Sequence, residues 1–401
     1  MNQSMLSVEQ ALAQLLAGAR PLDQIESVQT LAATGRVLAQ PQYAGVNVPP
    51  LDNTSMDGYA VRAAECSGGG ARLRVSQRIQ AGSIGLPVEP GTAARIFTGA
   101  PIPPGADAVV MQENCTLDGD HVIVRHKPAP GDWIRRAGDD IRAGMRILEA
   151  GARLRPQDIG LAASVGIASL SVVRRMKVAV FFTGNELVMP GEPLPEGAIY
   201  NSNRFTLTGL LQQFGCEITD LGIVPDTLAA TREALRRAAR DNDLVITSGG
   251  VSMGEEDHVK PAVEAEGRLD MWKIAVKPGK PLAFGRVGPA AFIGLPGNPV
   301  SAFVTFVIFV RPFLLCSQGV LRTEPPGFSL RADFDWARPD ARHEFLRARL
   351  NSSGALELFA NQGSAVLTST VWGDGLIDNP PKQAIRRGDM VRFLPWAELF
   401  R

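Results

Sequence analysis

The hydrophobic and polar positions of the chain follow three patterns in succession. Residues from about 45 to 145 hold short alternating runs, such as Arg72 to Val75, between clusters of proline and glycine. From Lys177 the chain alternates apolar runs with longer amphipathic stretches, and from about residue 321 the short alternating runs return. Short alternating runs are typical of β-rich modules. The sequence therefore predicts a β-rich segment, an α/β segment and a second β-rich segment, in that order.

The middle segment predicts strands and helices in alternation. Its apolar runs predict strands over residues 177–182, 217–224, 244–247, 271–276, 281–284 and 291–295. Its amphipathic and apolar stretches predict helices over residues 203–214 and 227–240 and from Asn298 onward. This alternation indicates a doubly wound, mostly parallel sheet, in which ligands bind beyond the carboxyl ends of the strands.

Further elements are expected at both ends of the chain. Ser7 to Gln10 forms a capping-box pattern that opens a helix reaching about Gly18, and Pro156 opens another short helix. The C-terminal runs predict the strands of a small barrel over residues 328–334, 343–350, 356–359 and 390–393.

The most apolar stretch, Ser301 to Cys316, predicts a buried core helix. It is shorter than the run of about 20 apolar residues that crosses a bilayer, and Arg311-Pro312 is expected to interrupt it. The N-terminus has no basic region followed by an apolar core, so no secretory signal is predicted. The 4 cysteines form no C-x-x-C pair, which argues against a zinc or disulfide framework and fits a cytoplasmic location.

Charge and composition narrow the possible partners. The 41 basic residues balance the 41 acidic residues, so no overall field draws the chain onto nucleic acid or an anionic membrane. Neither is expected as a partner. The chain also lacks the G-x-x-x-x-G-K-[ST] phosphate loop and the G-x-S-x-G nucleophile elbow.

The end of one predicted strand carries the first candidate site. Ser248-Gly249-Gly250 closes the apolar run, and Ser252 and a group of acids ending at Asp257 follow. Adjacent glycines allow a close backbone approach, and free N–H groups at such a turn favour an anion. Glycine pairs also end strands simply to turn the chain, so the pattern alone leaves both interpretations open.

Acids follow the predicted strands at three places, Glu186, Asp226 and Asp257. Parallel strands end at one edge of a sheet, so the three carboxylates could converge on one hard cation. A single acid at a strand end commonly serves as a cap or is solvated, and the inference therefore depends on all three.

Two proline-containing loops could hold a compact anion. In one, two lysines act as point charges toward an oxyanion. In the other, a strand passes into a helix whose free N–H groups attract anions, and Asn298 is expected to cap that helix. A solvated basic turn and a purely structural cap are the alternatives. The candidates in these loops are Lys277, Lys280, Pro296, Gly297, Asn298 and Ser301.

Six motifs stand in order along the chain: MDGYAV at 56–61, FTGAPIPPGADAVVMQE at 97–113, TGNEL at 183–187, SGGVSMGEEDH at 248–258, KPGKPLAFG at 277–285 and GLPGNPVS at 294–301. With these motifs the chain closely resembles the molybdopterin molybdenumtransferases, the molybdenum insertases of molybdenum-cofactor biosynthesis, which include the E domain of gephyrin. The resemblance runs nearly end to end.

The resemblance implies an elongated α/β multidomain subunit that acts as a homodimer. Its four domains would be a small linking α/β domain (domain I, residues 25–42 and 145–170), a β-rich inserted domain (domain II, 43–144), a doubly wound, mostly parallel molybdopterin-binding domain (domain III, 5–24 and 175–320) and a C-terminal β-barrel domain (domain IV, 321–401).

The resemblance also implies an activity. The substrate would be adenylyl-molybdopterin delivered by a molybdopterin adenylyltransferase. Cleavage dependent on molybdate and Mg²⁺ would release AMP and place molybdenum on the dithiolene, and molybdoenzyme chaperones would be further partners. A non-catalytic pterin-binding scaffold dimer, as in gephyrin, and a tungstate-specific insertase remain alternatives. The retained acids and lysines argue against a scaffold, and the flanking β modules argue against an adenylyltransferase.

Family positions carry over residue by residue. The acids of the pterin-nucleotide and metal site match Glu186, Asp226 and Asp257. Polar groups that the β-rich domain contributes across the dimer match Asp57, Thr98 and Asp140. The molybdate and substrate-anion pocket matches Lys277, Lys280, Ser301, Arg347 and Ser364. One departure is Asn185, where the family usually has Asp, which removes a negative charge beside the expected metal site.

Overall fold

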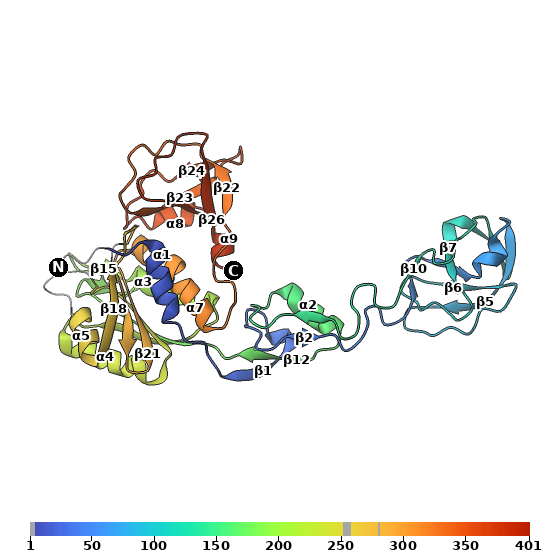
Figure 1. Cartoon of the computed structure of the whole chain (residues 1–401), viewed down its shortest axis with the longest axis horizontal. Helices are drawn as coiled ribbons and strands as arrows, with labels where there is room; N and C mark the ends of the chain where they lie inside the picture. Colours follow the sequence, from blue (N-terminus) through green and yellow to red (C-terminus); the bar gives the residue numbers. More distant parts are fainter. Residues whose placement is uncertain (1–4, 252–257, 280) are drawn as a thin grey trace.

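The computed structural model describes residues 5–251, 258–279 and 281–401, and the molecule is elongated (Figure 1). An α/β domain and a C-terminal sheet domain lie together at one end. A β-rich module forms the opposite end, and a small linking segment joins the two (Figure 1). The residue boundaries of the four domains stay predictions.

The α/β domain is built on a six-stranded sheet. In spatial order its strands are β16 (Glu217–Val224), β13 (Lys177–Thr183), β17 (Leu244–Ser248), β21 (Ala290–Leu295), β20 (Pro281–Val287) and β18 (Gly267–Lys273). The first four run parallel, and the last two pair antiparallel. The predicted mostly parallel sheet is confirmed.

Helices cover both faces of this sheet. On one face α1 (Val8–Ala17), α3 (Ser202–Gln213) and the long apolar helix share one core with the strands. On the other face lie α4 (Leu228–Asp241) and α5 (Val259–Glu266). The predicted capping box at Ser7 and Gln10 is present, so the local sequence fixes where α1 begins.

The apolar helix corrects a prediction. It runs unbroken through α6 (Pro299–Thr305), a π-helical turn (Phe306–Val310) and α7 (Arg311–Ser317). Proline lacks an N–H and clashes with the preceding turn of an α-helix, and the wider π turn immediately before it accommodates the ring. By length and composition these 19 residues could cross a membrane, but 89% of the apolar window is buried inside the protein. The helix is a core helix.

The strand predicted over residues 271–276 is also wrong in its bounds. β18 begins at Gly267 and ends at Lys273. The chain then leaves the sheet, and β19 (Val276–Lys277) pairs in parallel with β23 (His343–Leu350) of the C-terminal domain. The candidate loop at Lys277 therefore starts at the junction of two domains.

The C-terminal sheet has the order β19-β23-β25-β26-β22, and β24 pairs with β23. Its remaining elements are β22 (Phe328–Arg331), β24 (Leu356–Leu358), α8 (Thr368–Trp372), β25 (Gly375–Asn379), β26 (Met390–Pro395) and α9 (Trp396–Leu399). A bridge from Ala332, just after β22, to Leu356 in β24 closes the sheet on itself, as expected of the barrel that the alternating runs predicted.

The β-rich module holds another six-stranded sheet, of order β7-β4-β6-β5-β9-β8. Its strands are β4 (Gly58–Val61), β5 (Ala71–Ile79), β6 (Thr92–Ile96), β7 (Ala108–Met111), β8 (Cys115–Asp118) and β9 (His121–Val124), beside the pair β3 (Asn53–Thr54) and β10 (Ile134–Arg135). The linking segment holds β1 (Ile25–Gln29), β2 (Gln42–Tyr43), β11 (Arg146–Leu148), α2 (Pro156–Ser164) and β12 (Ser169–Val173).

Candidate functional site

A cavity of about 980 Å³ lies where the parallel strands end, between the α/β domain and the C-terminal sheet domain. Its walls come from the ends of β13 and β17, the starts of α3 and α6, and the loop 362–367. The cavity brings together these predicted site residues: Glu186, Asp226, Ser248, Gly249, Gly250, Lys277, Pro296, Gly297, Asn298, Ser301 and Ser364.

Two glycines shape this edge of the sheet. Gly249 has φ +96°, and a Cβ there would lie 2.3 Å from the backbone oxygen of Thr183. Gly184 has φ +149°, and its Cβ would lie 2.6 Å from a carboxylate oxygen of Glu186. Only glycine therefore lets β13 and β17 end this close together while Glu186 folds back over the turn.

Two of the three predicted metal ligands, Glu186 and Asp226, line the cavity. The third, Asp257, lies outside the described residues, as do Ser252 and Lys280. Among the residues that the structure describes, no group of three His, Cys, Asp or Glu side chains could hold a metal ion. The two described carboxylates supply oxygen atoms of the kind that Mg²⁺ prefers.

Ser248 is buried at the floor of the cavity and organises its neighbours. Its hydroxyl donates to the Pro296 carbonyl at 2.9 Å, and Asn203 Nδ2 donates to Ser248 Oγ at 2.9 Å and to the Gly297 carbonyl at 2.8 Å. These bonds hold the turn that leads into α6. Asn298 occupies the cap position, but its side chain makes no capping bond, so that part of the prediction is wrong.

Two other cavity-lining side chains carry buried polar atoms with no partner in the described part of the chain. They are the amide nitrogen of Asn201, whose oxygen caps α3, and the hydroxyl of Thr183. Buried polar groups normally form hydrogen bonds. Their unused capacity suits a cavity that receives a polar ligand.

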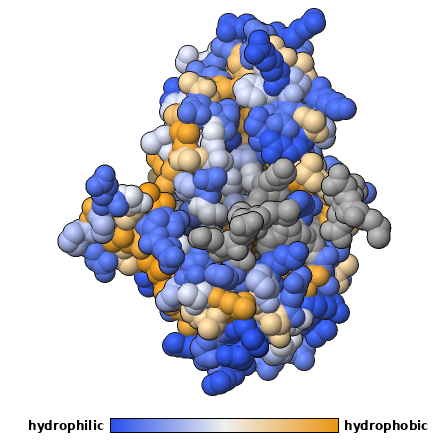
Figure 2. All heavy atoms as spheres, turned by 90° about the vertical axis from the view of Figure 1, so that its left-hand side faces the viewer, coloured by the Kyte–Doolittle hydropathy of each residue, from blue (hydrophilic) through white to orange (hydrophobic). Residues whose placement is uncertain are grey.

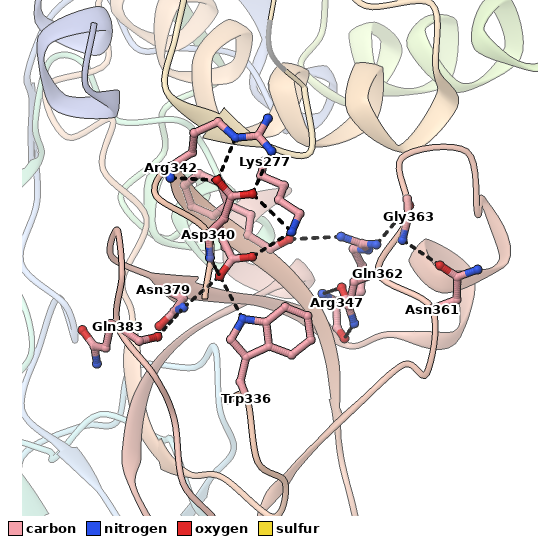
Figure 3. A network of polar contacts seen from close by, with 12 residues as sticks. Lys277, Trp336, Asp340, Arg342, Arg347, Asn361, Gln362, Gly363, Asn379 and Gln383 are labelled. Carbon is pink, nitrogen blue, oxygen red and sulfur yellow. Dashed lines mark hydrogen bonds and ion pairs between the residues drawn. The ribbon is translucent and has the colours of Figure 1, made fainter. Parts of the chain in front are cut away.

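Lys277 reaches across the domain junction (Figure 3). Its ammonium nitrogen lies 3.1 Å from Glu344 Oε1 and 3.5 Å from Asp340 Oδ2. The guanidinium of Arg342 donates two hydrogen bonds of 2.9 Å to Asp340, and these bonds hold the pKa of that carboxyl well below its ordinary value. Arg342 itself lines the cavity. Arg342 stands in a short charged run at the start of a strand, and no motif marks it as a site residue in the sequence.

Arg347 does not line the cavity. It is 0% exposed, and its guanidinium donates to Ser369 Oγ and to the carbonyls of Phe345 and Gly363. Burial lowers the pKa of Arg347 to about 10. Through its bond to the Gly363 carbonyl, the Arg347 side chain supports the loop that contains Ser364 (Figure 3).

The residues of the β-rich module lie at the other end of the molecule, away from the cavity of the same chain (Figure 1). Asp57 Oδ1 accepts hydrogen bonds from the N–H and the hydroxyl of Thr98, both at 2.7 Å, and these bonds lower the pKa of Asp57. Asp140 is exposed near the boundary with the linking segment. One subunit alone therefore does not join these three residues to the cavity.

Asn185, the departure from the family pattern, is exposed and is not among the residues that line the cavity.

Figure 2 shows the face on the left of Figure 1, where hydrophilic and hydrophobic residues are mixed and hydrophilic residues predominate over the upper lobe. A cavity with charged side chains at the carboxyl edge of a parallel sheet, bounded on one side by a barrel, is typical of α/β proteins that bind a charged ligand at a strand-end cleft.

Comparisons with known proteins identify the family. Family models match residues 6–166 (MoeA N-terminal region, domain I and II), 179–315 (probable molybdopterin binding domain) and 329–396 (MoeA C-terminal region, domain IV). The chain is 42% identical to the molybdopterin molybdenumtransferase of Haemophilus influenzae over 92% of both chains. It is 37% identical to molybdopterin molybdenumtransferase 2 of Mycobacterium tuberculosis over 93% of this chain and 94% of that protein.

Solved structures agree with this result. The molybdopterin biosynthesis MoeA protein of Pyrococcus horikoshii matches with TM-scores of 0.80 and 0.85 in two crystal structures, at 29% identity. These matches cover 99% and 98% of this chain and 100% of the other. The chain belongs to the molybdopterin molybdenumtransferase family, and it is an enzyme of this type with a role in molybdenum-cofactor biosynthesis.

Proposed function

We propose that the chain is a molybdenum insertase that cleaves adenylyl-molybdopterin, releases AMP and transfers molybdenum from molybdate to the dithiolene. The single observation that carries this proposal is the cavity, which combines carboxylates, a lysine and the start of a helix at the carboxyl edge of the sheet. A substrate with phosphates and a metal oxyanion needs that combination of charges.

Each wall of the cavity has a distinct part in this proposal. The turn at Gly250 and the residues that lead into α6 would approach the phosphate oxygens with their backbone. The Gly249 and Val300 N–H groups do not take part, because they already donate to the carbonyls of Leu295 and Ser364. Lys277, Ser301 and Ser364 would hold the oxyanion between the two domains. Because no nucleophilic side chain is needed, a molybdate oxygen or water can attack the adenylate.

Glu186 and Asp226 would hold Mg²⁺ with Asp257 as the third ligand. When bound, Mg²⁺ would offset negative charge on the phosphates. Glu186 and Asp226 both line the cavity near the strand ends, where a cation would be able to contact them and the substrate phosphates. Asp257→Ala is expected to abolish molybdate-dependent AMP release and to leave the oligomeric state unchanged.

The route of attack can be tested directly. We propose that a molybdate oxygen bonds to the adenylate phosphorus while the P–O bond to the molybdopterin phosphate breaks. That oxygen stays with AMP when molybdenum passes to the dithiolene sulfurs. Molybdate labelled with ¹⁸O should therefore give labelled AMP, and label that arrives only from water would overturn direct attack.

The deciding experiment measures AMP release from adenylyl-molybdopterin by the purified protein with Mg²⁺, with and without molybdate. Release that requires molybdate supports the insertase, and replacing molybdate by tungstate tests the metal preference. Binding without release would favour the scaffold alternative. Because Asn185 lies off the cavity wall, Asn185→Asp should change the rate by less than about threefold, within the range of surface substitutions.

A further inference from the structure

Lys277, which lines the cavity, is bound to the C-terminal domain through both its backbone and its side chain. In the parallel pairing of β19 with β23, Lys277 stands in register with Glu344. The side chains of the same two residues meet in an ion pair of 3.1 Å. Backbone and side chain thus fix one lysine against one carboxylate.

Glu344 is a buried carboxylate with hydrogen-bond partners on both oxygens. Its side chain is 0% exposed. Its second oxygen accepts from Trp336 Nε1 at 2.8 Å, from the Asp340 N–H at 3.1 Å and from Asn379 Nδ2 at 3.4 Å. A buried carboxylate is costly unless it is paired, and in the described part of the chain its ionic partner is Lys277 alone.

We propose that Glu344 is a positioning residue, whose buried carboxylate fixes the ammonium group of Lys277 at the point where the cavity receives an oxyanion. This inference rests on the proposed function only for the nature of that anion. It makes the C-terminal domain part of the anion site through a residue that never touches the ligand (Figure 3).

The local charges indicate that Glu344 affects anion binding by positioning Lys277, and not by changing the net charge of the cavity wall. Lys277 and Arg342 are balanced by Asp340 and Glu344, so the group adds no net charge to the cavity wall. An ammonium group has three donors. Glu344 takes one and Asp340 approaches a second, and the lysine side chain remains 36% exposed at the cavity. A donor is left for a ligand and points in a direction that the carboxylates set.

Three variants of the full-length protein separate position from charge. Glu344→Asp keeps the charge but withdraws the carboxylate, Glu344→Gln removes the charge, and Asp378→Asn is the matched control. Asp378 is a largely buried carboxylate of the same sheet that pairs with His343 and Arg392, and among the described residues it forms no ion pair with Lys277. If a Glu344 variant does not fold, Asp340→Asn releases the same ammonium group from its more exposed side.

The first measurement needs no anion. The rate at which acetic anhydride modifies Lys277, followed by peptide mass spectrometry, should rise severalfold in both Glu344 variants and stay unchanged in Asp378→Asn. An unchanged rate in the Glu344 variants would overturn the proposal, because it would show that the ammonium group does not depend on Glu344.

The second measurement is equilibrium dialysis of molybdate. Both Glu344 variants should bind molybdate about tenfold more weakly, as expected for the loss of one well-placed charged hydrogen bond. Charge alone predicts tighter binding by Glu344→Gln and no change in Glu344→Asp, and either result would overturn the proposal. If wild-type protein binds no molybdate, the proposed function fails, while the acetylation rates still decide the position of Lys277.

Discussion

At the scale of single residues, the site is a set of charges whose positions are set by neighbours. Glu186 rests over Gly184, and Lys277 is held by two carboxylates. The acids and the lysine lie on different walls of one cavity. This separation allows a cation and an oxyanion to be held side by side on one substrate.

The two described acids should be needed for turnover and dispensable for folding. Glu186→Gln and Asp226→Asn each remove a charge of the expected cation site, and each should lower kcat for AMP release by about a hundredfold or more. The midpoint of thermal unfolding should move by less than about 2 °C, because both acids line an open cavity and neither belongs to a hydrophobic core. Wild-type turnover in either variant would remove that acid from the mechanism.

Acid should lower the free energy of unfolding by protonating Asp340 of the C-terminal domain. Arg342 lowers the pKa of Asp340 from its ordinary 3.8, so the folded protein binds that proton more weakly than the unfolded chain does. The stabilisation is complete above about pH 4 and is lost as the pH falls toward the folded pKa. Asp340→Asn should therefore cost about 1 kcal/mol at pH 7 and much less at pH 2. Urea unfolding followed by tryptophan fluorescence measures both values, and a constant difference would contradict the assignment.

Sequence reasoning found the residues that carry motifs and misjudged those that depend on tertiary packing. The motifs and the rule that ligands bind at strand ends correctly predicted that Glu186 and Lys277 line one cavity. The family resemblance implied Arg347 in the anion pocket, whereas in this chain its guanidinium is buried and donates to the carbonyls of Phe345 and Gly363. Arg342 has no motif and reaches the cavity only because Asp340 orients it. Side-chain direction is decided by contacts distant in sequence, which a pattern does not record.

At the scale of elements, the ends of β13 and β17 set the floor of the cavity. A Cβ on Gly184 would meet the end of a flexible side chain, whereas a Cβ on Gly249 would meet a backbone oxygen. The same substitution should therefore have different effects at two neighbouring turns. The apolar runs predicted these strands well because both are buried on both faces. The pattern misplaced β18 and missed β25, whose short apolar run stands between Gly375 and the turn-forming residues Asp378 and Asn379.

Gly184→Ala should displace Glu186 and lower AMP release about tenfold or more while the fold survives. Alanine strains the backbone at both positions, because both glycines have positive φ. Gly249→Ala adds a clash with the backbone oxygen of Thr183, so it should lower the free energy of unfolding by about 1–3 kcal/mol, more than Gly184→Ala does. Gly209→Ala is the control, because that glycine lies inside α3 with nothing within 4 Å of its Cβ, and it should stabilise the protein by about 0.5–1 kcal/mol. Activity assays and thermal unfolding of the three variants check the contrast, and equal effects at Gly184 and Gly249 would refute it.

At the scale of the whole molecule, the elongated shape separates groups that the family pattern assigns to one site. Asp57 and Thr98 form a tight polar pair in the β-rich module, at the far end from the cavity (Figure 1). The pair is preorganised in the single chain, because Thr98 already donates two bonds to the carboxylate. A second subunit that brings its module to the cavity would complete the site, and this arrangement is the reason to expect a homodimer.

Mixing two inactive variants tests that arrangement. Asp57→Asn and Asp226→Asn alter opposite ends of the molecule, and each should be inactive as a homodimer. If Asp57 serves the partner's cavity, a heterodimer has one intact site and one doubly altered site. Random exchange makes half of the dimers mixed, so refolded equimolar mixtures should recover about a quarter of wild-type AMP release. If Asp57 serves its own cavity, no site is restored and the mixture stays inactive. If Asp57 serves no cavity, the Asp57→Asn homodimer is itself active before mixing, which would also contradict the arrangement. Size-exclusion chromatography of both variants before mixing ensures that a lack of recovery does not come from a lost dimer.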